Sequence, residues 1–242
     1  AADNIAITAS GGNVLVNGAN PGSGVLAAST VDFIDVTASG DFANSINASG
    51  VTSAAGFSSA FLTLRLVAAE GNDTVTGSEF RDTIKGGLGD DMLTGGAGSD
   101  QYEFFLFSPV TDNDVIDESG GGTDFVCIFT EAGGATLDLN VAGPQVVHAN
   151  LTLTLGSATT IENACANFGG NLLTGNTLDN MMNAGGTGCQ ALGREITRFD
   201  LAVMCQALLV QADTPTQFFL QAHQWYVSRV VPQWDDTILC CS

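Results

Sequence analysis

Four aspartates recur at a fixed interval of nine residues in the middle of the chain, and their chemistry points to a metal. They are Asp73, Asp82, Asp91 and Asp100. Carboxylates supplemented by backbone carbonyls form the oxygen-only shell that Ca²⁺ prefers. Two carboxylates held close together repel each other unless a cation lies between them. The spacing therefore predicts sites for a hard cation, with Ca²⁺ as the expected ion.

The aspartates belong to four consecutive nine-residue units that run from residue 68 to residue 103. The sixth position of each unit is Asp, and the eighth is a large, mainly apolar side chain: Val75, Ile84, Leu93 and Tyr102. The last two units also have Gly at positions one, two and four, which gives the pattern GGxGxDxUx. This pattern resembles the calcium-binding nonapeptide of the RTX, or hemolysin-type, family. The resemblance implies an all-β fold, a right-handed parallel β-roll or β-solenoid with Ca²⁺ in its Gly/Asp turns.

The repeat also predicts how the sites are spaced. Gly-rich residues can turn through backbone angles that other residues avoid, and the residues around the eighth position can form a short strand. Two units make one coil, so neighbouring turns on one side of the stack come from residues 18 apart in the sequence. This places Asp73 beside Asp91 and Asp82 beside Asp100, so two calcium sites are the minimum. A solvated loop is the alternative, but a loop has no reason to keep a nine-residue phase.

The remaining candidate ligands share the same Gly/Asp turns or the segment that follows them. In the repeats they are Gly71, Asn72, Gly87, Gly89, Asp90, Gly96 and Gly98. After residue 103 the phase slips, but residues 112–116 and 122–126 again place an Asp two residues before an apolar side chain. Asp114 and Asp124 are therefore candidates for a further, irregular site.

Composition divides the chain into four regions. Residues 1–67 contain short β-branched and apolar runs between Gly-rich turns, which predicts strands that begin the same stack without calcium loops. Residues 68–131 are the predicted calcium-binding roll. Residues 132–188 are predicted to continue the β-structure with degenerate repeats in which Asn171 and Asn180 occupy the sixth position. An amide offers oxygen but no charge, so calcium sites there should be weak or absent; a plain Gly-rich loop is the alternative.

The region 189–242 differs in character and contains both tryptophans and four of the six cysteines. Apolar residues at helical spacing and a capping box at 214–217 favour a helical hairpin. A C-terminal type I export signal and a tail foreign to the repeat protein are the two alternatives. The six cysteines have no CxxC spacing, so disulfides are possible in an oxidising compartment and a cysteine metal site is not expected.

The chain is strongly acidic, with 26 acidic and six basic residues and a net charge of −20. Residues 70–124 contain 13 of the acids and only two bases, so this block should repel itself without metal and fold with it. This excess of negative charge argues against nucleic acid and anionic membranes as partners. There is no apolar run of 18 residues, so no membrane span is predicted, and the N-terminal residues do not read as a signal peptide.

The sequence lacks the motifs of two enzyme classes, the zinc site of RTX-bearing metalloproteases and the nucleophile elbow of lipases. The two histidines are in no HExxH motif, and there is no GxSxG. We therefore expect a non-enzymatic structural or adhesive protein, secreted or at a bacterial cell surface. Low charge outside the repeats and an N-terminus without a recognisable cap predict self-association into oligomers or fibres, with a cell surface or extracellular polysaccharide as further partners. The alternative is the C-terminal secretion and folding module of a larger type I secreted enzyme, which a catalytic domain upstream in the same reading frame would support.

Overall fold

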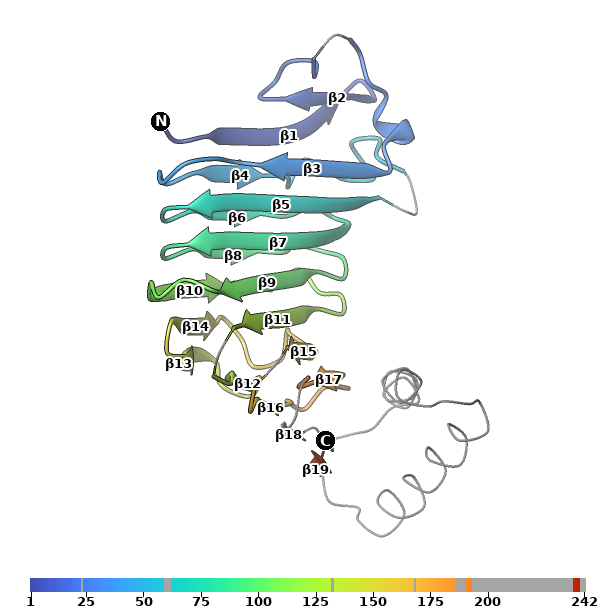
Figure 1. The fold of residues 1–242 in the computed structure, drawn as a ribbon. Helices are drawn as coiled ribbons and strands as arrows, with labels where there is room; N and C mark the ends of the chain where they lie inside the picture. Colours follow the sequence, from blue (N-terminus) through green and yellow to red (C-terminus); the bar gives the residue numbers. More distant parts are fainter. Residues whose placement is uncertain are drawn as a thin grey trace, which may run out of the picture.

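The computed structural model describes residues 1–22, 24–58, 62–131, 133–167, 169–185, 190–192 and 237–239. Within these ranges the chain is nearly all β-structure, stacked in successive coils (Figure 1). The helical structure described there is a single 3₁₀ turn, η1 (Ala28–Thr30). The prediction of an all-β protein is thus confirmed for the described residues. The predicted helices at 193–236 lie outside them.

Consecutive strands in the middle of the chain alternate between two sheets. One sheet has the order β13-β14-β10-β8-β6-β4-β1-β2, and its strands are β1 (Asn4–Ser10), β2 (Asn13–Val16), β4 (Ser45–Asn47), β6 (Thr74–Thr76), β8 (Met92–Thr94), β10 (Asp112–Ile116), β13 (Gly143–His148) and β14 (Leu151–Leu155). The other has the order β17-β15-β11-β9-β7-β5-β3, and its strands are β3 (Phe33–Thr37), β5 (Thr63–Glu70), β7 (Arg81–Leu88), β9 (Gln101–Leu106), β11 (Phe125–Thr130), β15 (Asn163–Ala166) and β17 (Met182–Asn183). A third, four-stranded sheet contains β12 (Thr136–Asp138), β16 (Leu172–Thr174), β18 (Gln190–Leu192) and β19 (Thr237–Leu239).

Strand pairing in the repeat region is parallel and follows the predicted 18-residue coil. Thr74 of β6 pairs with Met92 of β8, and Thr83 of β7 pairs with Gln101 of β9. The same interval returns in the degenerate repeats, where β15 pairs with β17 and β16 pairs with β18. The degenerate units therefore stack as coils, as predicted, and are not a loop. The stack also reaches β18, beyond the boundary predicted at residue 188.

The core lies between the two sheets and is built from the eighth positions of the repeats. Because successive side chains of a strand point to opposite faces, one residue per short strand points inward. Val75, Ile84 and Tyr102 are fully buried, and Leu93 is 1% exposed. Burial of a side chain of this size stabilises the fold by about 1.5–3 kcal/mol. The eighth position of each nine-residue unit therefore supplies one buried side chain to the core for every half coil.

Three antiparallel pairs depart from the predicted all-parallel roll: β1 with β2, β13 with β14, and β18 with β19. At the N-terminus, Gly11 and Gly12 both have positive φ, which is the geometry of a two-residue hairpin turn. Strand β2 consequently folds back over β1 and covers its edge. This hairpin was not recognised in the sequence; it makes β2 the end strand of the sheet, and residues 26–28 bond to part of its outer edge.

Cys127 of β11 and Cys165 of β15 form a disulfide across the second sheet, 38 residues apart in the sequence. The two cysteines are direct register partners in parallel strands. The expected oxidising compartment is compatible with this bond. It ties the coil after the repeats to the following one by a covalent link.

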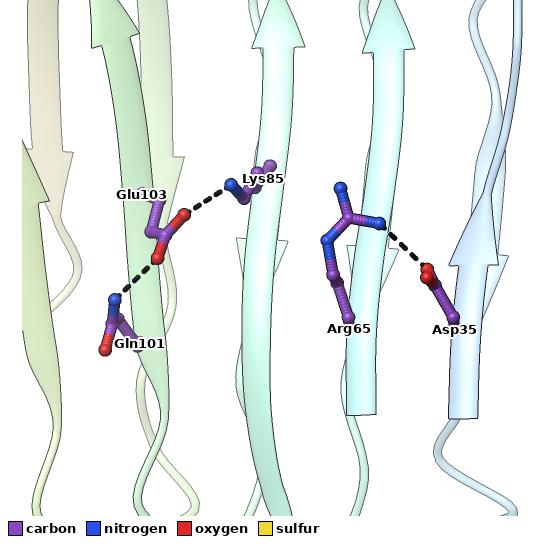
Figure 2. A network of polar contacts seen from close by, with 5 residues as sticks. All are labelled: Asp35, Arg65, Lys85, Gln101 and Glu103. Atoms are coloured by element: carbon purple, nitrogen blue, oxygen red, sulfur yellow. Dashed lines mark hydrogen bonds and ion pairs between the residues drawn. The ribbon is translucent and has the colours of Figure 1, made fainter. Parts of the chain in front are cut away.

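The outer face of the second sheet carries ion pairs that run from strand to strand. Figure 2 shows Arg65 of β5 beside Asp35 of β3, and Lys85 of β7 beside Glu103 of β9, with N–O distances of 2.9 and 2.5 Å. Gln101 donates a hydrogen bond to Glu103 at 2.6 Å. A solvent-exposed pair such as Arg65 with Asp35 contributes at most about 1 kcal/mol, whereas Lys85 and Glu103 are more buried. Each pair joins neighbouring parallel strands of the sheet.

Candidate metal sites

The turns between strands stack into two columns at opposite edges of the coils (Figure 1). The first turn column contains residues 71–73, 89–91 and 107–111, which lead from β5 to β6, from β7 to β8 and from β9 to β10. The second turn column contains residues 77–80, 95–100 and 117–124, which lead from β6 to β7, from β8 to β9 and from β10 to β11. The sixth-position aspartates of the repeats alternate between the two columns.

Carboxylates form a hydrogen-bond ladder in each column. In the first column the backbone N–H of Asp73 donates to Asp91 Oδ1 at 2.8 Å, and that of Asp91 donates to Asp114 Oδ1 at 2.9 Å. In the second column Asp82 N–H donates to Asp100 Oδ1, and Asp100 N–H donates to Asp124 Oδ1, both at 2.8 Å. The structure thus brings together the pairs that the 18-residue spacing predicted. The candidates Asp114 and Asp124 also join the ladder, 23 and 24 residues after Asp91 and Asp100. They lie in different columns, so they do not form the single further site that the sequence suggested.

The second oxygen of most of these carboxylates is buried and unsatisfied. Oδ2 of Asp73, Asp91, Asp100 and Asp124 has no hydrogen-bond partner among the described residues. The parent side chains are at most 2% exposed. A buried carboxylate oxygen without a partner is costly, and a cation bound between coils would satisfy it. The donor set therefore fits an oxygen-seeking ion such as Ca²⁺.

Glycines let neighbouring coils approach closely enough for this ladder. Gly87, Gly89, Gly96 and Gly98 all have φ between 99° and 121°, which L side chains rarely adopt. A Cβ on any of them would overlap a backbone carbonyl oxygen of the preceding coil, such as Ala69 O above Gly87. These glycines are therefore required for stacking as well as for turning. The carbonyls that face them lie beside the carboxylate ladder.

Residues 67–102 match the RTX calcium-binding nonapeptide repeat family in four copies. This segment is a run of four RTX repeats. RTX repeats bind Ca²⁺ and are typical of secreted bacterial proteins. No curated protein and no solved structure shows significant similarity to the chain. Among the residues that the structure describes, no helix is long and apolar enough to cross a membrane.

Other predicted ligands of the RTX repeats have different surroundings. Both oxygens of Asp82 accept hydrogen bonds from Ser78, one from its N–H at 2.6 Å and one from its hydroxyl at 3.1 Å. Asn72 and Asp90 are exposed and accept hydrogen bonds from the backbone of the next coil. A Cβ on Gly71 would overlap Phe42 O, so Gly71 has the stacking role of the other glycines. These side chains contribute no unpartnered buried oxygen.

Three acidic side chains that the repeat pattern did not identify lie in the same columns. Asp112 Oδ1 accepts a hydrogen bond from Gly89 N–H at 3.0 Å, and Glu162 Oε2 accepts one from Asp124 N–H at 2.7 Å. Glu118 is 2% exposed and lies beside Asp100 and Asp124. All three follow the end of the nine-residue phase. Asp112 and Glu118 belong to the acid-rich stretch after residue 103, whereas Glu162 is an isolated acid without a sequence signal.

Burial raises the pKa of the ladder carboxylates far above the usual value near 3.8. Desolvation is the main cause, and neighbouring carboxylates add to it. The pKa rises to about 8 for Asp91 and Asp100, and to about 7 for Asp82, Asp114 and Asp124. Without metal these groups therefore hold protons near neutral pH. A bound cation would take the place of those protons.

Acidification is expected to act in opposite directions on calcium-free and calcium-loaded protein. Because folding raises the pKa of Asp91 from about 3.8 to about 8, the folded calcium-free state binds more protons than the unfolded chain between these values. Its stability should therefore increase as the pH falls from about 8 to about 4. With Ca²⁺ present, protonation competes with the ion, so acidification should reduce stability. Circular dichroism of dialysed protein across this range, with and without Ca²⁺, checks both directions; parallel pH profiles would contradict the assignment.

Proposed function

We propose that the protein is a non-enzymatic, extracellular structural or adhesive protein whose right-handed β-roll is held by Ca²⁺ and which associates with itself. The observation that carries the calcium dependence is the row of buried carboxylate oxygens without partners in the two turn columns. A roll whose coils repel each other without a divalent cation will persist where Ca²⁺ is plentiful. Extracellular fluids meet that condition, because extracellular calcium modules bind with dissociation constants of about 10⁻⁴–10⁻³ M.

An aromatic cluster on the outer face of the second sheet supports self-association. The cluster consists of Phe105, Phe107 and Phe129 on or next to β9 and β11. Phe105 stacks on Phe129 with 4.8 Å between ring centroids and meets Phe107 edge-on at 5.8 Å. Phe105 and Phe107 are 41% and 50% exposed. A flat sheet face with clustered exposed rings resembles a contact surface more than a solvated wall.

The N-terminal hairpin and the aromatic cluster bear on how copies of the protein would associate. Strand β2 is the end strand of the first sheet, and residues 26–28 bond to part of its outer edge, which leaves less backbone free to pair with another chain. The second sheet offers the exposed rings of the aromatic cluster on its side, next to the ion pair of Lys85 and Glu103. Contact through the walls of the rolls is therefore favoured over end-to-end strand pairing. Such contact would need the coils to be ordered, and hence Ca²⁺.

Light scattering on the whole protein tests this function. In millimolar Ca²⁺ the protein is expected to form oligomers or fibres, and in chelator it should not. Phe105→Ser should reduce assembly strongly while leaving the circular dichroism of the calcium-loaded protein unchanged. The matched control is Val146→Ser, which removes an apolar side chain that is 71% exposed on β13, outside the aromatic cluster. A strictly monomeric species at high protein concentration in Ca²⁺ would overturn the proposal.

A further inference from the structure

A third carboxylate lies against the Asp100 and Asp124 pair in the second turn column. Glu118 belongs to the turn after β10 and is 2% exposed, while Asp100 and Asp124 are fully buried. One carboxylate oxygen from each of the three lies within 4.8 Å of the others. Glu118 is not part of a nonapeptide unit, so the repeat register does not account for it. Three negative groups this close require a positive charge or protons.

No basic side chain supplies that charge within the described residues. The two ion pairs found there, Arg65 with Asp35 and Lys85 with Glu103, use other carboxylates on the outer sheet face. Asp100 Oδ2 and Asp124 Oδ2 are instead buried without any hydrogen-bond partner. Both oxygens belong to side chains with no exposed surface. The trio therefore keeps two buried acceptor oxygens, Asp100 Oδ2 and Asp124 Oδ2, to which no described residue donates.

The oxygen atoms converge on the backbone of Gly95. A Cβ on Gly95 would overlap Glu118 Oε2, Asp100 Oδ2 and Tyr102 Oη. Gly95 has no positive φ, so the absence of a side chain is not needed for its backbone conformation. The absence of a side chain is needed because a Cβ would occupy the space between these oxygens. Glycine at this position keeps the volume between the oxygens open.

Tyr102 fixes the position of Glu118. Its hydroxyl donates a short hydrogen bond to Glu118 Oε2, and Gly120 N–H donates to Glu118 Oε1 at 3.3 Å. Tyr102 occupies the eighth, core position of its unit, where the other units have Val, Ile and Leu. An aliphatic side chain would fill the core but could not hold a carboxylate. The tyrosine thus links the core to the turn that provides the third acid.

We propose that Asp100, Glu118 and Asp124 form a divalent-cation site outside the nine-residue register, with Tyr102 as the positioning residue. The donors are all oxygen, and their irregular arrangement suits Ca²⁺, which accepts six to eight oxygens in flexible geometry, better than Mg²⁺. The site joins the last RTX coil to β11, where the coil lengthens from 18 to 24 residues. This inference rests on the proposed calcium-dependent fold.

Terbium luminescence and calcium titration of the full chain test the site. Tb³⁺ replaces Ca²⁺ at oxygen sites, and Tyr102 lies next to the carboxylates, so excitation of this tyrosine should sensitise the bound ion. Glu118→Gln should weaken this one site about tenfold or more, because a ligand charge is lost. It should also remove about one bound Ca²⁺ per chain at sub-saturating concentration and most of the sensitised emission. Tyr102→Phe should abolish the sensitised emission and weaken, but not eliminate, the same site.

Two controls separate the possible failures. Glu131→Gln changes an exposed acid just beyond β11 and should leave stoichiometry and emission unchanged. Asp91→Asn should remove a Ca²⁺ from the first turn column with little change in emission sensitised by Tyr102. Unchanged calcium stoichiometry and affinity in Glu118→Gln would overturn the proposed site. Failure of the wild-type protein to bind any Ca²⁺ would overturn the proposed function itself.

Discussion

Calcium-free protein at about pH 8 should lose most of its strand signal in circular dichroism and regain it when millimolar Ca²⁺ is added. The physical reason is electrostatic, because 13 acidic residues and only two basic ones occupy residues 70–124. Several of these acids are buried with an oxygen that has no partner. At this pH the carboxyl groups of the unfolded chain are ionised, so the calcium-free chain must either take up protons on folding or bury charges that nothing compensates. Ca²⁺ removes both penalties at once.

Ionic strength provides the control for the calcium experiment. NaCl screens repulsion between exposed charges but binds poorly to a buried oxygen shell. Sodium at matched ionic strength should therefore restore little of the signal, and Mg²⁺ should restore less than Ca²⁺ because it demands near-octahedral geometry. A strand signal that is unchanged by chelation would contradict the calcium dependence. Full recovery in NaCl would show that screening, and not site binding, controls the fold.

Gly87→Ala should be among the most destabilising single substitutions in the repeats. Gly87 has φ +121°, and its new Cβ would overlap the carbonyl oxygen of Ala69, which is backbone and cannot rotate away. Strain from the φ angle alone costs about 1–3 kcal/mol. The overlap adds to that, because neighbouring coils would have to separate and break the carboxylate ladder. Urea denaturation in millimolar Ca²⁺ should show a large fall in the free energy of unfolding, or no folded state.

Gly121→Ala is the matched control for this substitution. Gly121 also has positive φ, +79°, but a Cβ there would meet no atom within 4 Å. The control should therefore lose only the strain contribution of about 1–3 kcal/mol. Equal losses for the two variants would mean that close stacking of the coils contributes nothing, contrary to the structure.

The repeat register could be predicted from the sequence because it is both local and periodic. Each nine-residue unit has Asp at its sixth position and a large, mainly apolar residue at its eighth. These two positions determine which side chains face the turns and which face the core. Pairing at an 18-residue interval follows from two units per coil. Ala69 shows how strong this register is: it stands where Gly87 stands two units later, and it adopts the same left-handed region with φ +86°.

Asp114 and Asp124 lie outside the register and could still be predicted, because each stands two residues before an apolar side chain. Other residues outside the register could not be placed from the sequence. Glu118 enters the second turn column only because the coil after the repeats is longer, and nothing local fixes that length. The hairpins of β1 with β2 and of β13 with β14 reverse the chain direction, which a parallel repeat does not indicate. The repeat pattern identified Tyr102 as a core residue because its ring is apolar. It did not indicate that the hydroxyl of this tyrosine would donate a short hydrogen bond to Glu118.

The carboxylate ladder gives the stack a direction. At each rung the donor is a backbone N–H of the earlier coil and the acceptor is a side chain of the later one, from Asn44 with Asp73 to Asp124 with Glu162. The ladder acceptors of each coil therefore lie on the coil that follows it. Shortening the chain from its C-terminal side would remove these carboxylates and leave the ladder N–H groups of the new last coil without partners. Shortening it from the other side would leave carboxylates without their ladder donors, together with backbone N–H groups that donate to the preceding coil, such as those of Asp90 and Asn113. The two ends of the stack are therefore chemically different.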